Sequence, residues 1–166
     1  MKTILEDIEL SSIIRLKEVN ATDYIAFINK EISRRHNNRD LDTDTDMMLR
    51  ITPYDKLPDT HERSRRYYFI RTVEGMAGYI VLLRNKMSFL DGLYILPEFR
   101  RRKIATQAVQ LSGVTECMVK SHNNEAIQLY RSLGFEIVQK SEADKYGTQV
   151  DYRSHVLFKY QIMRKT

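Results

Sequence analysis

The block between residues 66 and 97 constrains the fold of this chain more than any other segment. Three apolar runs rich in β-branched and aromatic residues are separated by short turns at Glu74-Gly75 and Asn85-Lys86. The runs are Tyr67–Ile70, Gly78–Leu83 and Phe89–Leu96, and Pro97 stops the third. Strands joined by turns this short pair antiparallel. The block therefore predicts an antiparallel hairpin followed by a third strand.

Strand and helix patterns alternate on both sides of this block. The expected strands cover residues 13–19, 114–119, 135–138 and 156–162. One helix is expected from the capping run Asn20–Asp23 to about Arg35, with Tyr24, Ile25, Phe27, Ile28 and Ile32 facing a core. A polar loop over 36–46 and a short helix over 47–51 follow. Later helices start near Ile104, with Ala108 and Leu111 on the same face, and at Asn124, and end at Gly113 and Gly134.

This order predicts one α/β domain over residues 1–166, with helices on both faces of a mixed sheet. A chain of 166 residues is long enough for one hydrophobic core. Its 42% apolar and 30% charged residues exclude a disordered chain, a collagen-like repeat and a disulfide scaffold.

The sequence also predicts a soluble cytoplasmic protein. Cys117 is the single cysteine, so no internal disulfide can form, and we expect it to pack as a small hydrophobe. No apolar run approaches the ~18 residues that a membrane span requires. Acidic residues follow Met1 too soon for a secretory signal peptide.

Positive charge is concentrated in the C-terminal part. The net charge is −3 over residues 1–60 and +8 over residues 61–166. Solvated surface cations, nucleic-acid contact and binding of a phosphorylated cofactor all explain this asymmetry, and charge alone does not separate them.

The segment from Leu93 to Thr106 is the most informative for chemistry. A strand stops at Pro97, four consecutive cations follow from Arg100 to Lys103, and a helix begins. The free N–H groups and the dipole at a helix start favour an anion, and arginine can bind phosphate in bidentate form. The segment fits a phosphate site, while a solvated basic run or a nucleic-acid patch remains the alternative.

Two segments, residues 97–105 and residues 123–135, resemble motifs of the GNAT superfamily of acetyl-CoA-dependent N-acetyltransferases. Residues 97–105 resemble the family's pyrophosphate loop, Arg/Gln-x-x-Gly-x-Gly/Ala. Residues 123–135 match the pattern Asn-x-x-Ala-x-x-Leu-Tyr-x-x-x-Gly-Phe at every specified position. The second motif is the specific one, and the hairpin at Glu74–Ile80 is also typical of the family. The resemblance covers roughly residues 12–160, and it implies a mostly antiparallel twisted sheet with a splayed parallel strand pair.

The resemblance also implies roles for individual residues. The strand backbone at Leu93 and Ile95 would bind the pantetheine arm of acetyl-CoA, and Asn123 would bind near its thioester. Tyr130 occupies the general-acid position, with a core aromatic as the alternative role. Asp91 is the candidate base, because it precedes Leu93 by two residues and so shares its strand face; a surface ion pair is the alternative. The phosphates would be held by Arg100, Arg101, Arg102, Lys103, Ile104, Ala105 and Thr106.

Two departures from the family pattern stand out. Lys103 occupies the position of the loop's first glycine, where glycine lets the backbone approach the pyrophosphate. Only 17 residues separate Ala105 from Asn123, so we expect a short helix after the loop.

No metal site is expected. The alternating carboxylates of residues 40–46 lack the glycine and the glutamate of a calcium loop, since Thr45 and Ile51 stand there. This acidic loop could instead attract a cationic acceptor, or simply be solvated. The histidines have no metal-ligand spacing.

The resulting hypothesis is direct acetyl transfer to a primary amine on a small molecule or a protein. The alternative is a weakly active or inactive GNAT-fold module that binds acyl-CoA, nucleic acid or protein. A tRNA acceptor is open but not favoured, no membrane partner is expected, and homodimers are common in the family.

Overall fold

The computed structural model describes residues 13–38, 63–121, 123–138, 148–150 and 157–166. These residues fall into two compact units. The first combines the described parts of Met1–Val19 and Arg63–Cys117, and the second those of Asn20–Glu62 and Met118–Thr166.

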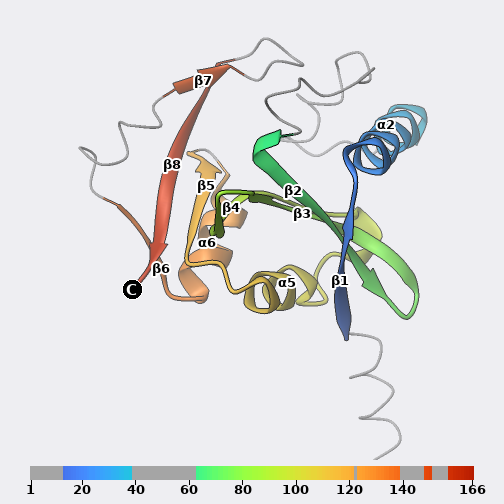
Figure 1. The fold of residues 1–166 in the computed structure, drawn as a ribbon. Coiled ribbons are helices and arrows are strands. Elements are labelled where there is room, and N and C mark those ends of the chain that lie inside the picture. The colour runs from blue at the N-terminus through green and yellow to red at the C-terminus, as the bar shows by residue number, and fades with distance from the viewer. Residues whose placement is uncertain (1–12, 39–62, 122, 139–147, 151–156) are drawn as a thin grey trace, which may run out of the picture. The chain divides into compact units, whose positions relative to one another are not determined.

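The first unit is built on the predicted hairpin (Figure 1). Its strand order is β1-β2-β3-β4-β5, in which the first four strands pair antiparallel and β5 pairs parallel to β4. The sequence therefore predicted the hairpin and the third strand correctly. The bounds are β1 Ile14–Val19, β2 Arg65–Thr72, β3 Gly75–Leu83, β4 Lys86–Ile95 and β5 Glu116–Lys120, whose first two residues belong to this unit.

Two glycines explain how β3 fits between its neighbours. Gly75 closes the β2–β3 turn at φ 126°, a backbone conformation that residues other than glycine rarely adopt. Gly78 allows a close approach, because a Cβ atom there would lie 1.9 Å from the carbonyl oxygen of Tyr94 on β4.

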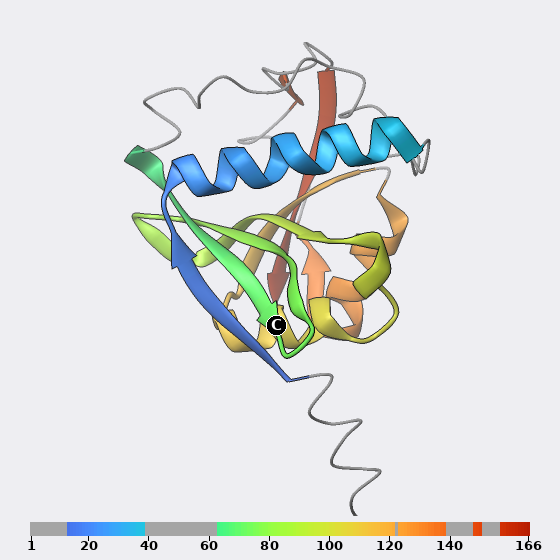
Figure 2. The same ribbon diagram turned by 90° about the vertical axis from the view of Figure 1, so that its right-hand side faces the viewer.

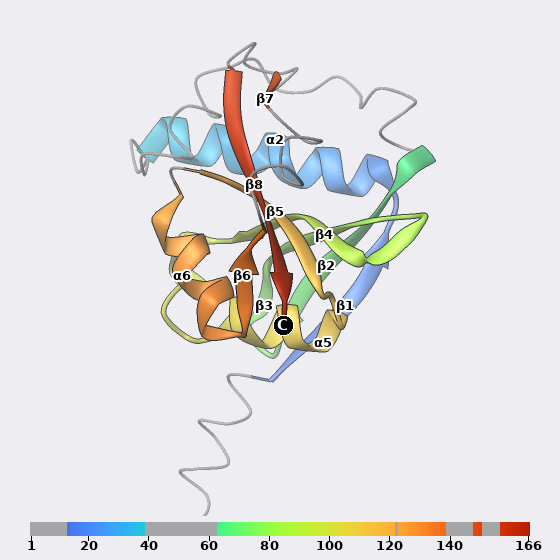
Figure 3. The same cartoon turned by 90° about the vertical axis from the view of Figure 1, so that its left-hand side faces the viewer.

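Helix α5 (Ile104–Ser112) packs on this sheet, against β1 and β4 (Figure 3). It follows the short helix η1 (Pro97–Phe99) and buries Ile104, Ala108 and Val109. Leu111, which was expected on the buried face, is exposed, because it lies in the last turn where no described element covers it. Gly113 ends the helix in the left-handed conformation, as predicted, and the nine residues of α5 agree with the expected short helix.

The second unit contains α2 (Ala21–Asn38), the end of β5, α6 (Asn124–Ser132), β6 (Phe135–Ile137), β7 (Thr148–Val150) and β8 (Leu157–Lys165). Its strand order is β5-β8-β6, and β8 pairs antiparallel with both β6 and β7 (Figure 3). Helix α6 packs against β6. The sequence did not predict β7.

Helix α2 is the longest described helix (Figure 2). Its start was predicted correctly, since the Asn20 side-chain oxygen accepts the N–H of Asp23 at 2.8 Å. Tyr24, Phe27 and Ile28 are buried. The helix continues to Asn38, so residues 36–38 are helical and not part of a loop. The rest of the expected loop and the helix over 47–51 lie outside the described residues.

The predicted fold class is confirmed: the chain has a mixed α/β fold in which one strand pair is parallel and the others are antiparallel. The single domain over 1–166 stays a prediction. None of the helices in the described ranges is both long enough and apolar enough to cross a membrane.

Candidate functional site

A β-bulge in β4 lies at the predicted base, Asp91. Val81 of β3 pairs with Gly92, and the next residue, Leu82, pairs with Leu90. Asp91 is therefore one extra residue with no Cα partner on β3. An extra residue of this kind bends the strand and redirects side chains, which is a recurring device beside functional sites.

Asp91 is held by an arginine two strands away. The Nε atom of Arg65, the first residue of β2, donates to Oδ2 of Asp91 at 2.7 Å. The Arg65 side chain is 24% exposed and the Asp91 side chain 14%. Sequence reasoning missed Arg65, because nothing in the sequence links two residues 26 positions apart.

The bulge corrects the argument that Asp91 and Leu93 share a strand face. Leu93 pairs with Ile80 and lies on the same face as that residue. Arg65, which contacts Asp91, lies on the opposite face with Val81, because β2 and β3 pair regularly there. The two-residue spacing fails as an argument here, since the extra residue breaks the alternation of the strand.

The backbone of β4 presents alternate peptide groups to its two edges. The Tyr94 carbonyl oxygen faces Gly78 of β3, and the N–H of Leu96 donates to Ala77 at 2.7 Å. By alternation, the N–H and C=O groups of Leu93 and Ile95 point to the other edge. The pairs between β4 and β5 involve Phe89 and Leu90 alone, so in the described part of the chain this register ends before Leu93.

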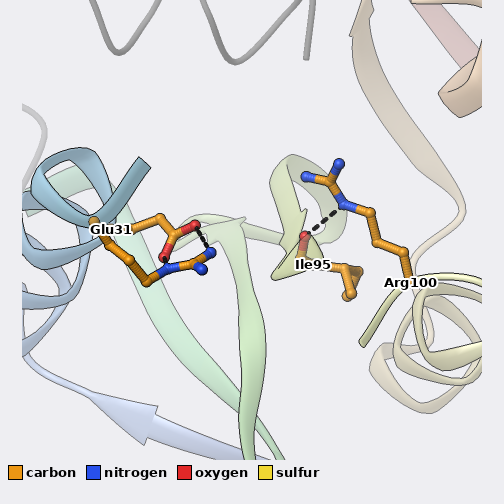
Figure 4. A network of polar contacts seen from close by, with 4 residues as sticks. Glu31, Ile95 and Arg100 are labelled. Carbon is orange, nitrogen blue, oxygen red and sulfur yellow. Dashed lines mark hydrogen bonds and ion pairs between the residues drawn. The ribbon is translucent and has the colours of Figure 1, made fainter. Parts of the chain in front are cut away.

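Arg100 lies at that edge. Its Nε atom donates to the carbonyl oxygen of Ile95 at 2.9 Å (Figure 4), and its guanidinium lies 5.5 Å from the centre of the Tyr94 ring. Arg100 therefore ties the loop after β4 to the end of the strand.

Two residues of the loop adopt the left-handed backbone conformation without being glycine. The φ angles of Arg101 and Lys103 are 64° and 60°. This conformation costs an L-residue about 1–2 kcal/mol. Lys103 occupies the position of the first glycine in the family's loop pattern. Its φ angle lies in the left-handed region, which glycine adopts at little cost.

The four loop cations divide into two pairs. Arg100 is engaged as described, and Arg102 bonds Glu74 at 2.8 Å and lies over the Phe99 ring. Arg101 and Lys103 are exposed and, as far as the described residues go, have no ion-pair partner. Two positive charges thus remain available to an external anion.

The N–H groups at the start of α5 face no protein acceptor that the described residues supply. Lys103 precedes the helix and makes no side-chain capping bond. The first N–H after Arg100 to reach a backbone acceptor is that of Gln107, which donates to Lys103 at 3.1 Å. The backbone from Arg101 to Thr106, including Ile104 and Ala105, can therefore bind an anion, although the Ile104 side chain is buried.

Asn123 and Tyr130, the remaining predicted site residues, belong to the second unit. The Asn123 side-chain oxygen accepts the N–H of Ala126 at 3.2 Å and so caps α6. Tyr130 is 4% exposed, and its ring meets Phe135 edge-on at 5.7 Å between centroids. Their roles near the thioester and as general acid stay predictions.

Other predicted and charged groups lie apart from the loop. Cys117 is fully buried, as expected for a packed side chain. Across the described ranges, no group of His, Cys, Asp and Glu side chains could hold a metal ion. Burial raises the pKa of Tyr68 above its ordinary value of 10.0, and a hydrogen bond from Arg66 to Glu18 raises the pKa of Arg66.

Comparison with known proteins tests the family resemblance. Residues 63–137 match the family model described as "Acetyltransferase (GNAT) domain". Over these residues the chain is similar to GNAT acetyltransferase domains. The resemblance read from the two motifs is confirmed, and the matched residues include the bulge, the loop and α6. No curated protein matches the sequence.

Solved structures of acetyltransferases have a similar fold. An acetyltransferase from Thermus thermophilus is 15% identical, with a TM-score of 0.52 over 90% of this chain and 95% of that one. A spermidine N-acetyltransferase SpeG chimera from Vibrio cholerae and hSSAT is 16% identical, with a TM-score of 0.52 over 92% and 94%. A probable acetyltransferase from Staphylococcus epidermidis is 13% identical, with a TM-score of 0.52 over 91% and 97%.

Proposed function

We propose that this GNAT protein transfers an acetyl group from acetyl-CoA directly to a primary amine, without an acyl-enzyme. The observation that carries the proposal is the loop from Arg101 to Thr106, where two unpaired cations and a row of open N–H groups lie together. A pyrophosphate fits this arrangement, because it offers several anionic oxygens to N–H donors and to charged side chains.

The edge of β4 would bind the pantetheine arm. Leu93 and Ile95 direct their peptide groups away from β3 and supply the donors and acceptors that an amide-rich chain needs. The Ile95 carbonyl already accepts from Arg100, so the arm would either use its second lone pair or displace that guanidinium. Asn123 would bind near the thioester.

In the reaction, the nitrogen lone pair of a neutral amine attacks the thioester carbonyl carbon. A C–N bond forms, the C–S bond breaks, and the thiolate leaves. We propose that Asp91 accepts the proton of the amine, directly or through a water, and that Tyr130 donates a proton to the leaving thiolate. Oδ1 of Asp91 has no hydrogen-bond partner in the described part of the chain and can accept that proton.

The acceptor belongs to the class of primary amines. A polyamine is one candidate, since a fold relative carries the name spermidine N-acetyltransferase, and a protein amine is another. A cytoplasmic location is part of the proposal and rests on the single cysteine.

The test is a coenzyme-release assay with acetyl-CoA across polyamines, aminoglycosides, lysine peptides and peptide N-termini. Tyr130→Phe should lower kcat by about 100-fold, because the thiolate then leaves unprotonated, with little change in acetyl-CoA affinity. Leu129→Met, its neighbour on α6, is the control. Equal turnover by Tyr130→Phe and the parent contradicts the general-acid role.

Lys103 favours one second candidate, a GNAT-fold module that binds acyl-CoA without turnover. A lysine at the usual glycine position brings a side chain where the backbone would otherwise approach the pyrophosphate. Heat of acetyl-CoA binding combined with no coenzyme release for any amine would favour this candidate.

A further inference from the structure

We propose that Arg65 is a positioning residue that orients the Asp91 carboxylate for proton transfer. The inference rests on the proposed function, in which Asp91 is the base. It extends the site to β2, a strand that neither motif reaches.

The bulge creates the need for such a residue. Asp91 is the extra residue of β4, so the regular pairing with β3 does not fix its position. The bond from Arg65 Nε to Oδ2, at 2.7 Å, supplies a fixed contact from a different strand. A base displaced by about 1 Å can cost on the order of 100-fold in rate.

Arg65 is itself held in place. Its Nη1 atom donates to the Ser64 side-chain oxygen at 3.0 Å, and its carbonyl oxygen accepts from Arg84 at 3.3 Å. The Arg84 N–H also donates to the Ser64 carbonyl at 2.8 Å. The Ser64 side chain therefore holds the guanidinium, and the two bonds from Arg84 hold the backbone that carries it.

The geometry of the pair leaves one carboxylate oxygen accessible. Arg65 bonds Asp91 through Oδ2 alone, whereas Arg34 on α2 bonds both oxygens of Glu31, at 2.8 and 3.0 Å (Figure 4). A carboxylate held at both oxygens is built for a fixed ion pair. Asp91 is oriented through one oxygen and keeps Oδ1 for an incoming proton.

Arg66 provides a matched control. It is the next residue on β2, projects to the opposite face and forms its own ion pair, with Glu18 of β1. Its Nε–Oε2 bond is 2.6 Å, close in length to that of Arg65. Replacing Arg66 therefore removes a neighbouring, more exposed arginine–carboxylate pair without touching Asp91.

The experiment compares the parent with R65M, R65K, R66M, D91N and the double variant R65M/D91N, using the best amine from the screen. We expect R65M to lower kcat by about 10-fold or more, with KM for acetyl-CoA within about twofold. R65K should restore part of the loss, and R66M should match the parent. The double variant should be no slower than D91N, because Arg65 acts through Asp91. Melting temperatures of R65M and R66M should fall by similar small amounts.

The outcomes separate this inference from the function beneath it. A parent that acetylates no amine, or D91N at the parental rate, overturns the proposed base and the positioning role together. A slow D91N beside R65M at the parental rate overturns the positioning role alone. Rate losses in R65M and D91N that multiply in the double variant also overturn it, since Arg65 would then act independently of Asp91.

Discussion

The two helices that carry the family motifs begin in opposite ways. At α6, Asn123 places its side-chain oxygen on the N–H of Ala126, so the protein satisfies its own helix start. At α5, Lys103 adopts the left-handed conformation and offers no side-chain cap. The N–H groups at the start of α5 remain open, beside the unpaired side chains of Arg101 and Lys103.

This difference separates a helix start that is capped by its own residue from one whose N–H groups stay open to a ligand. A capped start gains stability from its own residues, typically about 1 kcal/mol. An uncapped start beside residues with strained backbone is less stable by itself and gains when an anion binds. The comparison therefore predicts that changes at α5 affect cofactor affinity, whereas the cap at α6 affects stability.

The largest expected effect is on cofactor affinity. Replacing both Arg101 and Lys103 with glutamine removes the two unpaired charges and keeps side chains of similar length. We expect acetyl-CoA affinity to fall by about 10-fold or more, since a hydrogen bond to a charged group contributes about 1.5–3 kcal/mol. Calorimetric titration at low and high salt measures the acetyl-CoA affinity of the parent and the variant.

The control for this variant is glutamine at Lys17 and Lys120, two cations outside the loop. The parent should lose affinity with added salt more steeply than the loop variant does. If the loop variant binds as tightly as the parent, these cations are solvated surface charges.

An intermediate effect is expected at the α6 cap. Asn123→Ala removes the bond to the Ala126 N–H and should lower the free energy of unfolding by about 1 kcal/mol. Asn124→Ala, one position later, is the control and should change stability much less. Thermal unfolding measures both, and an unchanged stability in Asn123→Ala contradicts the capping role.

The smallest effect is expected at Lys103, where a substitution should raise the free energy of unfolding instead of lowering it. Lys103→Gly relieves about 1–2 kcal/mol of left-handed strain and loses roughly 0.5–1 kcal/mol to the entropy of the unfolded chain. The protein should gain about 0.5 kcal/mol, measured by urea unfolding. Lys103→Ala keeps the strain and should show no gain, and a destabilised glycine variant would contradict the strained conformation.

Sequence predicted the parts of this comparison that depend on local patterns. The hairpin, the start of α2, and the glycines after α5 and α6 follow from alternation, capping residues and turn chemistry. The left-handed backbone at Arg101 could not be predicted, because no glycine marks it. At Lys103 only the family pattern pointed to an unusual position.

The bulge and its ion pair lay beyond local reasoning. Asp91 stands in a run that reads as an ordinary strand, so a two-residue spacing gave the wrong face. The partner on β2 becomes visible only when pairing brings Arg65 near β4. Side chains brought together by sheet register leave no local signal in one sequence.

The most direct test of the central claim is calorimetric titration of the full chain with acetyl-CoA. The open helix start and free cations of the α5 loop predict saturable binding that weakens in the Arg101/Lys103 glutamine variant and persists in Asn124→Ala, whose side chain has no assigned role in binding. No heat at millimolar acetyl-CoA would contradict the account.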